Sequence, residues 1–521
     1  MRILIFHGYL LGGTGSNVYN ARLAGALVAL GHEVHLLCQD RHPEEQPFVD
    51  AIGDWDAGAL QVRELRDESA GISSGAGRCT VYRPNIGNLL PVYVADRYEG
   101  IEARPFADCT DAEIAAYLDG NVPAVEEIVA HVRPDVALAN HLVMGPAILA
   151  RALAGRTPYA VKVHGSALEY TVKPHRERFL DFAREGLAGA RGVLVGSHHT
   201  AASLWAALED SALPARTRLG PPGVEVARFV PRDPPRAAAG LAELTARMRA
   251  TAPESTGPES SGPGNAASAF ARDELAAADA LARLEPGRDR LVAFVGKLIV
   301  NKGVDLLLAA WPLVLQGTPN ARLVVVGFGA DRALFERLLG TLTAGDLEAA
   351  EGLALPHLRA FLRSLDGDAR ASYTDAARAL PNRVVFTGRL DHGELSDLLP
   401  VCEAMVVPST FPEAFGMVAA EAAACGVLPI SAAHSGLAEV SSALSRAVPE
   451  EVAPLLSFPV DDASVAALAA RIMAWLEIDP AVRERARAGL VQTVRERWSW
   501  EGVARGVIAA ARGELDALAE P

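Results

Sequence analysis

The sequence predicts an α/β protein with two parallel-sheet domains, and three features of the chain lead to that prediction. Continuous apolar runs such as residues 291–295 end in glycine-rich turns, and amphipathic helices follow those turns. Unbroken apolar runs indicate strands that are buried on both faces, as in a parallel sheet. The chain has 521 residues, of which 50% are hydrophobic and 22% are charged, so it can fill two cores and exceeds the usual size of one.

The amino-terminal half begins with a β-α-β unit. Residues 2–6 form an apolar strand, and a glycine-rich turn follows, then a helix that runs to Ala29 and a second strand. Gly12 and Gly13 let the backbone approach a ligand, and the helix start offers amide groups to a phosphate. The dinucleotide fingerprint would need a further glycine at position 18, which is Val18, so the match to nicotinamide-binding proteins is partial.

Two later strands of this half end in polar residues. The strand at residues 136–139 is followed by Asn140 and His141, and the strand that starts at Tyr159 leads to His164. A histidine at a strand end is often purely structural, because backbone groups readily pair with its donor and its acceptor.

The carboxyl-terminal half carries lysines at a strand-to-helix turn. Gly296, Lys297 and Lys302 lie between the strand at residues 291–295 and an amphipathic helix at residues 304–315. Cations in such a turn can neutralise the charge on a departing diphosphate where water is scarce. A Lys-Gly pair alone would usually lie in a solvated loop. Two further apolar runs repeat the strand-then-glycine pattern and end in Gly327 and Gly388.

The segment at residues 412–421, PEAFGMVAAE, places two carboxylates eight positions apart around the start of a helix. A strand is predicted before it at residues 404–409, so the turn belongs at the sheet edge where ligands of α/β proteins bind. Glu413 could accept hydrogen bonds from sugar hydroxyls and Glu421 from a vicinal diol such as a ribose. Alanine-rich helices with glutamates near the first turn are also common without any ligand, because the helix dipole stabilises such glutamates. The helix start would offer an anion the backbone amides of Phe415, Gly416 and Met417.

Together these motifs resemble the family 4 glycosyltransferases, which are retaining enzymes with the GT-B fold, in which two Rossmann-like domains face each other across a cleft. The resemblance covers most of the chain. It implies that Lys297 and Lys302, with Gly296, contact the diphosphate of the donor. It also implies that Glu413 holds the transferred sugar, that Glu421 holds the ribose, and that the base lies near Gly388 and Arg389. The family usually has arginine at position 297, so here a point charge replaces a planar, two-pronged contact.

The resemblance extends to the amino-terminal half. Gly12 and Gly13 would face the donor phosphate and the acceptor, and His164 would contact the transferred sugar or its acceptor. A solvated loop explains Glu169 and Tyr170 as well as an acceptor pocket does. The candidates for acceptor contact are Asn140, His141, Glu169 and Tyr170.

The function implied by the resemblance is the retaining transfer of a sugar from a nucleotide diphosphate sugar to an acceptor hydroxyl. The expected catalytic residues are His164, Lys297, Lys302 and Glu413, and no metal or cofactor is required. A sugar-nucleotide epimerase or hydrolase on the same fold is one alternative. A nicotinamide-dependent oxidoreductase and a binding protein with a degenerate site are others. The sequence leaves the sugar, the base, the acceptor and the oligomeric state open.

The same reading divides the chain into four parts. Residues 1–222 form the amino-terminal domain, and residues 291–495 form the donor domain with a helical insertion at about 342–379. Residues 231–290 are an expected insertion, and its tip at residues 251–267 is predicted to be disordered because Ser, Pro and Gly replace periodic apolar residues. Residues 496–521 resemble the terminal helix with which the family crosses back to its first domain.

Composition limits the partners and the compartment. The net charge of −15 argues against a broad basic surface for nucleic acid. The five cysteines are scattered without metal-ligand spacing, which fits reduced thiols in a cytoplasm, and neither a secretory signal nor a membrane-spanning run is expected. The amphipathic helix at residues 177–191 could touch the inner surface of a membrane transiently, or it could pack on the core of its own domain.

Overall fold

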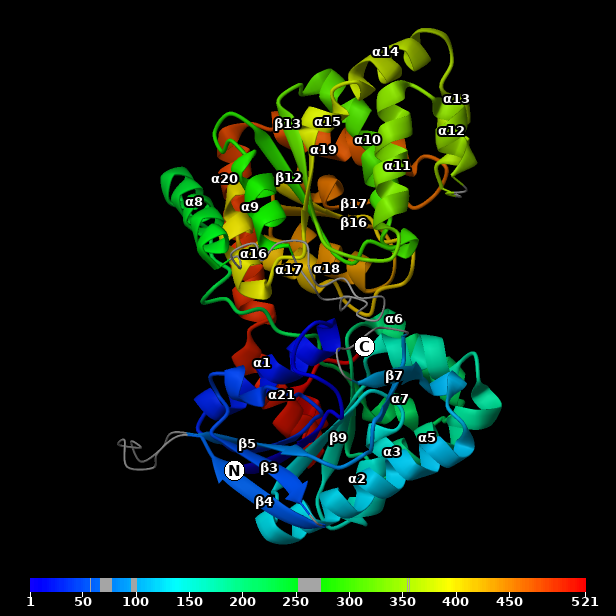
Figure 1. Cartoon of the computed structure of the whole chain (residues 1–521), viewed down its shortest axis with the longest axis vertical. Helices are drawn as coiled ribbons and strands as arrows, with labels where there is room; N and C mark the ends of the chain where they lie inside the picture. The colour runs from blue at the N-terminus through cyan, green and yellow to red at the C-terminus, as the bar shows by residue number, and fades with distance from the viewer. Residues whose placement is uncertain (57, 66–76, 95–100, 252–272, 354, 356) are drawn as a thin grey trace, which may run out of the picture. The chain divides into compact units, whose positions relative to one another are not determined.

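A computed structural model describes the chain except for residues 57, 66–76, 95–100, 252–272, 354 and 356. The chain divides into two compact units. The amino-terminal unit comprises Met1–Gly223 together with Trp498–Pro521, and the carboxyl-terminal unit comprises Val224–Arg497. Each unit is a parallel sheet with helices packed on it, which confirms the predicted α/β class (Figure 1).

Within its described residues, the amino-terminal unit has a nine-stranded sheet in the order β11-β10-β9-β8-β1-β2-β5-β3-β4. Neighbouring strands are parallel except for the antiparallel pair β3 and β4. Because β1 lies between β2 and β8, the strand order reverses there, and ligands of open α/β sheets bind beyond the carboxyl ends of the strands at such a point. The strands are β1 (Arg2–Phe6), β2 (Glu33–Leu37), β3 (Ala51–Asp56), β4 (Ala59–Glu64), β5 (Arg78–Arg83), β8 (Val136–Asn140), β9 (Tyr159–Lys162), β10 (Gly192–Val195) and β11 (Thr217–Leu219), and β6 (Leu89–Val92) pairs separately with β7 (Glu102–Pro105).

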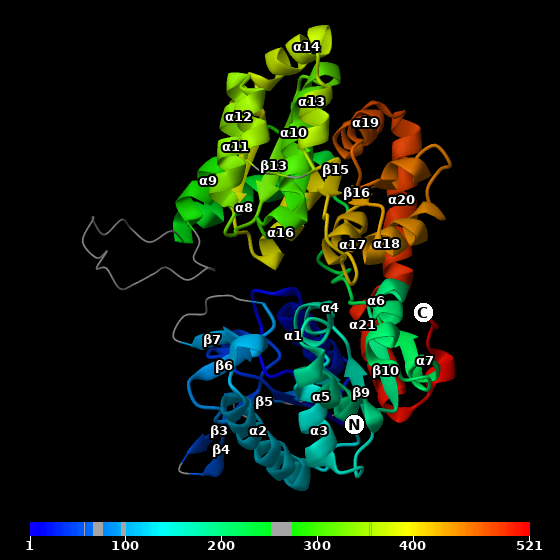
Figure 2. The ribbon, with the colours of Figure 1, turned by 90° about the vertical axis from the view of Figure 1, so that its right-hand side faces the viewer.

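Helices cover both faces of this sheet. Leu23 of α1 and Val507 of α21 belong to the buried cluster on one face, whereas Ile128 of α2, Ile148 of α3 and Phe179 of α5 belong to the cluster on the other. The red helix α21 lies among the blue and teal elements of this unit in both ribbon views (Figures 1 and 2), and it packs against α1, β8, β9 and β10. The helices are α1 (Gly15–Ala29), α2 (Asp111–Val132), α3 (Gly145–Leu153), α4 (Gly165–Ala167), α5 (Arg176–Ala188), α6 (His198–Leu208), α7 (Leu213–Arg216) and α21 (Trp500–Arg512).

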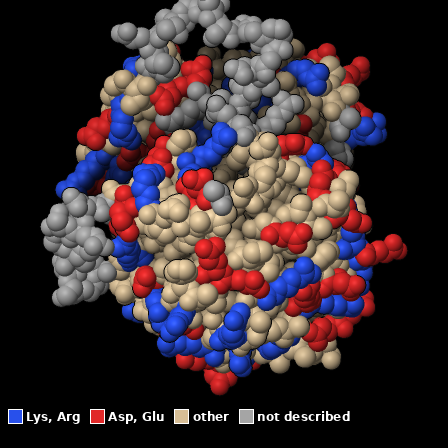
Figure 3. Space-filling model, turned by 60° about the horizontal axis from the view of Figure 1, so that its bottom comes forward, with Lys and Arg blue, Asp and Glu red and all other residues tan. Residues whose placement is uncertain are grey.

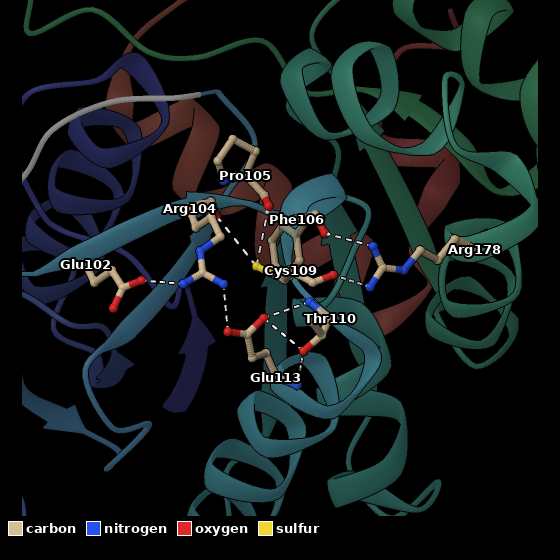
Figure 4. Close-up of polar contacts among 8 residues, drawn as sticks. All are labelled: Glu102, Arg104, Pro105, Phe106, Cys109, Thr110, Glu113 and Arg178. Carbon is tan, nitrogen blue, oxygen red and sulfur yellow. Dashed lines mark hydrogen bonds and ion pairs between the residues drawn. The ribbon is translucent and has the colours of Figure 1, made fainter.

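Helix α5, which is predicted at residues 177–191, uses both of its sides within the unit. Phe179 and Leu187 are buried in the core. On the polar side, the Arg178 guanidinium donates hydrogen bonds to the backbone carbonyl of Cys109 and to neighbouring carbonyls before α2 (Figure 4). Phe179 and Leu187 on the apolar side of α5 therefore pack on the core of their own unit.

The carboxyl-terminal unit has, within its described residues, a six-stranded parallel sheet in the order β14-β13-β12-β15-β16-β17. Its first strand in the chain, β12, lies between the second and the fourth, so the order reverses between β12 and β15. This is the strand order of nucleotide-binding sheets, and the ligand crevice lies at the carboxyl ends of the two central strands. The strands are β12 (Arg290–Val295), β13 (Ala321–Val326), β14 (Val384–Gly388), β15 (Ala404–Val407), β16 (Leu428–Ala432) and β17 (Ser457–Phe458).

The segment predicted as an insertion at residues 231–290 supplies two helices to this unit. Helix α8 packs against α9 and α16, and α9 packs against β14. Thr251 ends α8, and the rest of the segment predicted to be disordered lies outside the described residues. Within residues 342–379, α14 packs on α10 and α11. The helices are α8 (Pro234–Thr251), α9 (Glu274–Ala282), α10 (Val304–Gly317), α11 (Arg332–Ala344), α12 (Leu347–Gly352), α13 (Arg359–Ser364), α14 (Gly367–Ala377), α15 (Leu380–Arg383), α16 (His392–Leu398), α17 (Met417–Ala424), α18 (Ser435–Ser445), α19 (Ser464–Glu477) and α20 (Pro480–Arg497).

On the face seen in Figure 3, acidic and basic side chains are interspersed among uncharged ones. All five cysteines are buried free thiols, and burial raises the pKa of Cys38 and of Cys402 to about 12. None of the described helices is both long enough and apolar enough to cross a bilayer.

Candidate functional site

The loops that follow β12 and β15 are in backbone contact in the carboxyl-terminal unit. Gly303 has a φ of +67°, and a Cβ atom there would lie 1.9 Å from the carbonyl oxygen of Pro408. The carbonyl of Asn301 accepts a hydrogen bond from the Thr410 amide at 2.9 Å, and the hydroxyl oxygen of Ser409 lies 3.0 Å from the same carbonyl oxygen. Glycine is thus required at position 303, because only it combines this φ with this approach. The two predicted motifs consequently form one site at the strand-order reversal.

Lys302 and Glu413 meet across these two loops. The Lys302 ammonium donates to Oε1 of Glu413, and the Ser409 hydroxyl donates to the same oxygen at 2.8 Å. The Lys302 and Glu413 side chains are 31% and 26% exposed, so solvent reaches the pair. The sequence assigns these residues separately to a phosphate and to a sugar, and the structure adds that each is the other's ion-pair partner. A bound donor would therefore compete with the ion pair for both groups.

Gly296 and Lys297 begin the same loop. A Cβ atom at Gly327, which ends the run after β13, would lie 1.9 Å from the carbonyl oxygen of Gly296. The Leu298 amide donates to the carbonyl of Phe328 at 2.7 Å. The loop after β12 is thereby fixed on both sides by neighbouring loops, and Lys297 lies between these two anchor points, partly buried.

The start of α17 presents the predicted amides. Gly416 is the N-cap and Met417 is the first helical residue. The first amides of a helix have no acceptor within the helix, and the helix dipole is positive there. A Cβ atom at Gly416 would lie 2.8 Å from the Leu437 side chain, so the turn from Phe415 into the helix is closely packed.

Glu421 lies further along α17 and is 2% exposed. Its Oε1 lies 3.3 Å from Nε2 of His392, at the start of α16. The His392 ring also contacts Phe229, with the ring centroids 4.9 Å apart. Sequence analysis did not identify His392, because nothing in the sequence links position 392 to position 421. Ribose binding by Glu421 stays a prediction, and the contact with His392 is an addition to it.

The predicted base-binding residues lie at the end of β14, where Gly388 is the last residue of the strand and Arg389 follows it. Gly388 has a φ of +75°, its Cβ position faces open space, and its carbonyl accepts from the Gly327 amide at 2.9 Å. The Arg389 guanidinium lies 2.9 Å from the Asp391 carboxylate. This loop is therefore tied to the loop after β13, and Gly388 leaves room beside it.

The amino-terminal unit has a second polar cluster, at the strand-order reversal between β1 and β8. His7 is 1% exposed, and its Nδ1 accepts from the Asn20 carboxamide at 3.0 Å. Its Nε2 lies 2.9 Å from the carbonyl of Leu10 and 3.1 Å from Oδ1 of Asn17, so we place the ring proton on Nε2. Burial lowers the pKa of His7 to about 4, which keeps the ring neutral at pH 7. Sequence analysis missed His7, since a histidine directly after a strand carries no distinct signal.

Gly12 and Gly13 lie in the turn beside His7. The carbonyl of Gly12 accepts from the Asn17 carboxamide at 2.7 Å, and Gly13 has a φ of +91°. Nothing lies within 4 Å of a Cβ position at Gly12. The turn is thus held by Asn17 and is open at Gly12.

His164 and Asn140 are brought together as the sequence order of their strands suggests. The Asn140 carboxamide donates to the carbonyl of Phe6 at 3.3 Å, which leaves its Oδ1 to accept from Nε2 of His164 at 3.0 Å. Burial lowers the pKa of His164 well below its ordinary value, and the nearby His141 and Lys162 lower it further. His164 is therefore a neutral group with a fixed tautomer.

His141 lies between the two other histidines. Its ring centroid is 5.9 Å from that of His7 and 4.9 Å from that of His164. It is 1% exposed, and neither of its ring nitrogens has a hydrogen-bond partner in the described part of the chain. Burial, together with His7, lowers its pKa well below the ordinary value.

Lys162 is a buried amine next to this cluster that sequence analysis did not single out. It is 2% exposed, and its ammonium donates to the carbonyl of Gly220 and lies 5.6 Å from the centroid of the Tyr19 ring. Burial lowers its pKa to about 7.

The last two acceptor candidates lie in a π-helical turn after α4. The Glu169 carboxylate accepts from the Lys173 ammonium at 2.6 Å and from the Ser203 hydroxyl at 2.6 Å. Tyr170 is 41% exposed. Glu169 is thus engaged within its own unit, whereas Tyr170 faces solvent. Among the described residues, no group of three or more His, Cys, Asp and Glu side chains is arranged to hold a metal ion.

Two family models match the chain. The model described as glycosyl transferases group 1 matches residues 281–489, and the glycosyl transferase 4-like domain matches residues 14–223. Each match lies within one of the two units, and the carboxyl-terminal match includes β12 and β15, between which the strand order of its sheet reverses.

Individual relatives agree with this result. The chain is 30% identical over 246 residues to a D-inositol 3-phosphate glycosyltransferase of Segniliparus rotundus, over 47% of this chain and 44% of the relative. It is 26% identical over 217 residues to a GDP-mannose-dependent monoacylated alpha-(1-6)-phosphatidylinositol monomannoside mannosyltransferase of Corynebacterium glutamicum, over 40% and 44%. The chain thus spans less than half the length of these relatives.

Solved structures share the fold. Sucrose-phosphate synthase from Thermosynechococcus elongatus matches over 99% of both chains with a TM-score of 0.56 and 19% identity. HepE of Anabaena, in complex with UDP and glucose, matches over 99% of this chain and 100% of its own with a TM-score of 0.56 and 15% identity. The family models favour a glycosyltransferase over a nicotinamide-dependent oxidoreductase. The chain belongs to the group 1 glycosyltransferases, also called family 4, of the GT-B fold.

Proposed function

We propose that this protein transfers a hexose, with retention of configuration, from a nucleotide diphosphate sugar to an acceptor hydroxyl. The observation that carries the proposal is the Lys302–Glu413 pair at the strand-order reversal of the carboxyl-terminal unit. It joins a cation suited to a phosphate and an acceptor suited to a sugar hydroxyl at one point, on two loops that are in backbone contact.

The donor's diphosphate is assigned to Lys297, Lys302 and the first amides of α17. Negative charge on the leaving diphosphate grows as the glycosidic bond breaks, so fixed positive groups stabilise the transition state more than the ground state. When Lys302 turns to the phosphate, Glu413 loses its ion-pair partner and its carboxylate becomes available to sugar hydroxyls. Donor binding thus exchanges one ion pair for two contacts with the ligand.

Glu421 is assigned to the ribose, and Gly388 and Arg389 to the base. A buried carboxylate rejects a ligand that leaves it without a partner, because an unpaired buried charge is costly. A vicinal diol supplies two donors to it. His392 keeps Glu421 partnered while no nucleotide is bound.

The amino-terminal unit is assigned the reacting sugar and the acceptor, as family membership suggests. His164 is a neutral ring held by Asn140. A neutral ring can exchange hydrogen bonds with hydroxyl groups without a counter-ion. Asn140, His141 and Tyr170 remain the acceptor candidates, with Glu169 as a support for that turn.

The relatives and neighbours narrow the donor but not the acceptor. They include proteins named for GDP-mannose and structures solved with UDP and glucose, so we propose UDP- or GDP-hexose as the donor class. Their named products range from inositol phosphate derivatives to glycogen, so a hydroxyl group on a polyol, a carbohydrate or a lipid-linked sugar fits equally well.

The test is product detection with a panel of UDP- and GDP-hexoses, followed by mass spectrometry with and without polyol, glycan and glycolipid acceptors. We expect donor consumption that depends on an acceptor and yields a mass increase of one hexose. Donor consumption without an acceptor would indicate the hydrolase or epimerase alternative. No consumption with any donor, together with no thermal stabilisation by UDP or GDP, would refute the proposed function.

A further inference from the structure

We propose that Ser435 and His434, at the start of α18, are positioning residues that fix Glu413 for contact with the transferred sugar. No motif in the sequence marks either residue. The inference rests on the proposed function, because it concerns the same carboxylate, and it names two groups that act through Glu413 rather than on the substrate.

The hydroxyl of Ser435 is bound on both sides. The backbone amide of Glu413 donates to Ser435 Oγ at 2.9 Å. Because that oxygen is an acceptor in this contact, its own proton is free to reach Nδ1 of His434, which lies 3.0 Å away. The Ser435 hydroxyl therefore links the backbone amide of Glu413 to the His434 ring through two hydrogen bonds.

His434 closes the network. With Nδ1 as an acceptor, the ring carries its proton on Nε2, which lies 2.8 Å from the carbonyl oxygen of Ser409. The hydroxyl of Ser409 in turn donates to the Glu413 carboxylate at 2.8 Å. Glu413 is thus held at its backbone and at its carboxylate by one closed set of hydrogen bonds.

Backbone contacts with the start of α18 restrict movement of the loop that carries Glu413. The Gly436 amide donates to the carbonyl of Glu413 at 2.9 Å. A Cβ atom at Gly436 would lie 2.7 Å from backbone atoms of Ala414 and Phe415. A displacement of the helix start would therefore be passed on directly to the loop that carries Glu413.

The conformation of Ser435 makes the role of its hydroxyl testable. Its φ is +52°, in the left-handed region, which glycine adopts without strain and other residues adopt at a cost. Glycine would therefore satisfy the backbone better than serine does. Compared with glycine, the only hydrogen-bonding group that serine adds at this position is the hydroxyl that contacts Glu413 and His434.

The experiment compares Ser435→Gly with Ser435→Ala in the full-length protein. It measures the melting temperature, the affinities for UDP and GDP and for their hexose conjugates, and turnover. We expect the melting temperature of Ser435→Gly to equal or exceed that of the wild type, because the strain is relieved. We expect both variants to bind the bare nucleotide within about twofold of wild type and the sugar nucleotide about tenfold more weakly, with a similar loss in kcat.

Two further variants sharpen the result. Ser435→Asn supplies a carboxamide oxygen for the Glu413 amide and tolerates the left-handed conformation, so it should recover most of the lost sugar-nucleotide affinity. His434→Phe keeps an aromatic ring at this position but removes both hydrogen bonds of the imidazole, so it should lower kcat about tenfold as well. Ser442→Ala, at an exposed position of the same helix, is the matched control and should behave as wild type.

The outcomes separate this inference from the function on which it rests. A wild-type protein that binds no sugar nucleotide of the panel would refute the proposed function and this inference with it. A wild-type protein that binds and turns over the donor, with a Ser435→Gly variant of unchanged affinity and kcat, would overturn only the positioning role. Loss in Ser435→Ala alone would assign the effect to backbone strain and would also overturn that role.

Discussion

The carboxyl ends of the two sheets differ in how they hold their polar groups. In the amino-terminal unit, His7 and His141 are 1% exposed, and burial lowers the pKa of both and of His164. In the carboxyl-terminal unit, Lys302 and Glu413 are 31% and 26% exposed and form an ion pair. One sheet edge is neutral and largely withdrawn from water, whereas the other is charged and partly solvated.

This difference indicates which groups of a ligand each sheet edge can bind. A buried charge without a partner is costly, so a group that must lose water at the reacting sugar is better kept neutral. Charges that must meet a diphosphate can stay ionised only where solvent or a partner compensates them. The neutral edge therefore suits hydroxyl groups, and the charged edge suits phosphates.

The largest expected effect concerns the backbone contact that builds the charged edge. Replacing Gly303 by alanine should lower the free energy of unfolding by about 4 kcal/mol. The new Cβ atom would overlap the Pro408 carbonyl, and the alanine would have to adopt a positive φ. Gly388→Ala is the matched control. Its φ of +75° is similar but nothing lies near its Cβ position, so about 1 kcal/mol is expected. Denaturant unfolding of both variants measures the difference, and equal losses would show that the close approach at Gly303 contributes nothing.

A second test removes the cation of the charged edge. Lys302→Ala should lower turnover by about a hundredfold or more, equivalent to about 3 kcal/mol, by analogy with the removal of one oxyanion donor. The control is Arg505→Ala, which removes an exposed ion pair with Glu501 in the other unit. Steady-state kinetics with saturating donor measure the effect. Turnover at the wild-type level in Lys302→Ala would withdraw the phosphate role of this lysine.

The neutral edge should be sensitive to acid. An unfolded histidine takes up a proton near pH 6.5, whereas native His7 does so only near pH 4. Stability is therefore present above pH 6.5 and is lost as the pH falls towards 4, by about 3 kcal/mol for His7 alone. His141 and His164 act in the same direction. Urea unfolding between pH 7 and 4 should show a shallower loss in His7→Gln than in wild type, and parallel curves would contradict the buried neutral ring.

Lys162 predicts a trend in the same direction at higher pH. Its pKa is about 7 in the folded unit and about 10.5 when unfolded, so between these values only the unfolded chain binds the proton. Stability should rise with pH, by about 2 kcal/mol from pH 7 to pH 9. Lys162→Met, which keeps the length of the side chain without the amine, should lose this rise. A rise of equal size in the variant would mean that other groups cause it.

The smallest expected effect concerns nucleotide affinity. Glu421→Ala should weaken binding of the bare nucleoside diphosphate about tenfold, the loss expected when one charged hydrogen-bond acceptor is removed. Calorimetry measures the dissociation constant, and the exposed Glu450, replaced in the same way, serves as control. An unchanged constant in Glu421→Ala would reassign this carboxylate to its contact with His392.

The pattern of apolar runs and glycines was sufficient to predict most of the architecture. The strand predicted at residues 2–6 is β1 (Arg2–Phe6), and the first predicted helix ends at Ala29 as observed. The strand predicted at residues 404–409 is shorter, because β15 ends at Val407 and the chain turns to meet the loop after β12. Strand positions follow from local composition, whereas strand ends depend on which neighbouring loop binds the backbone.

The candidate site was predictable only in part. Lys302 and Glu413 stand out because their motifs lie at strand-to-helix turns, but their pairing joins positions 111 residues apart. His7, Lys162, His392, His434 and Ser435 carry no sequence signal of their own. Each acquires its role from a partner that the fold supplies, such as the Gly220 carbonyl for Lys162.

Local sequence was enough to predict the two α/β units, the glycine turns and the types of residue that lie at the carboxyl ends of the strands. Hydrophobic periodicity and the backbone freedom of glycine are local properties of the chain. The tertiary structure decided which polar groups are buried, which are paired and hence which are charged. Burial and hydrogen-bond partners depend on segments that are distant in the chain, so the neutral state of the histidine cluster and the support of Glu413 by α18 follow from the fold alone.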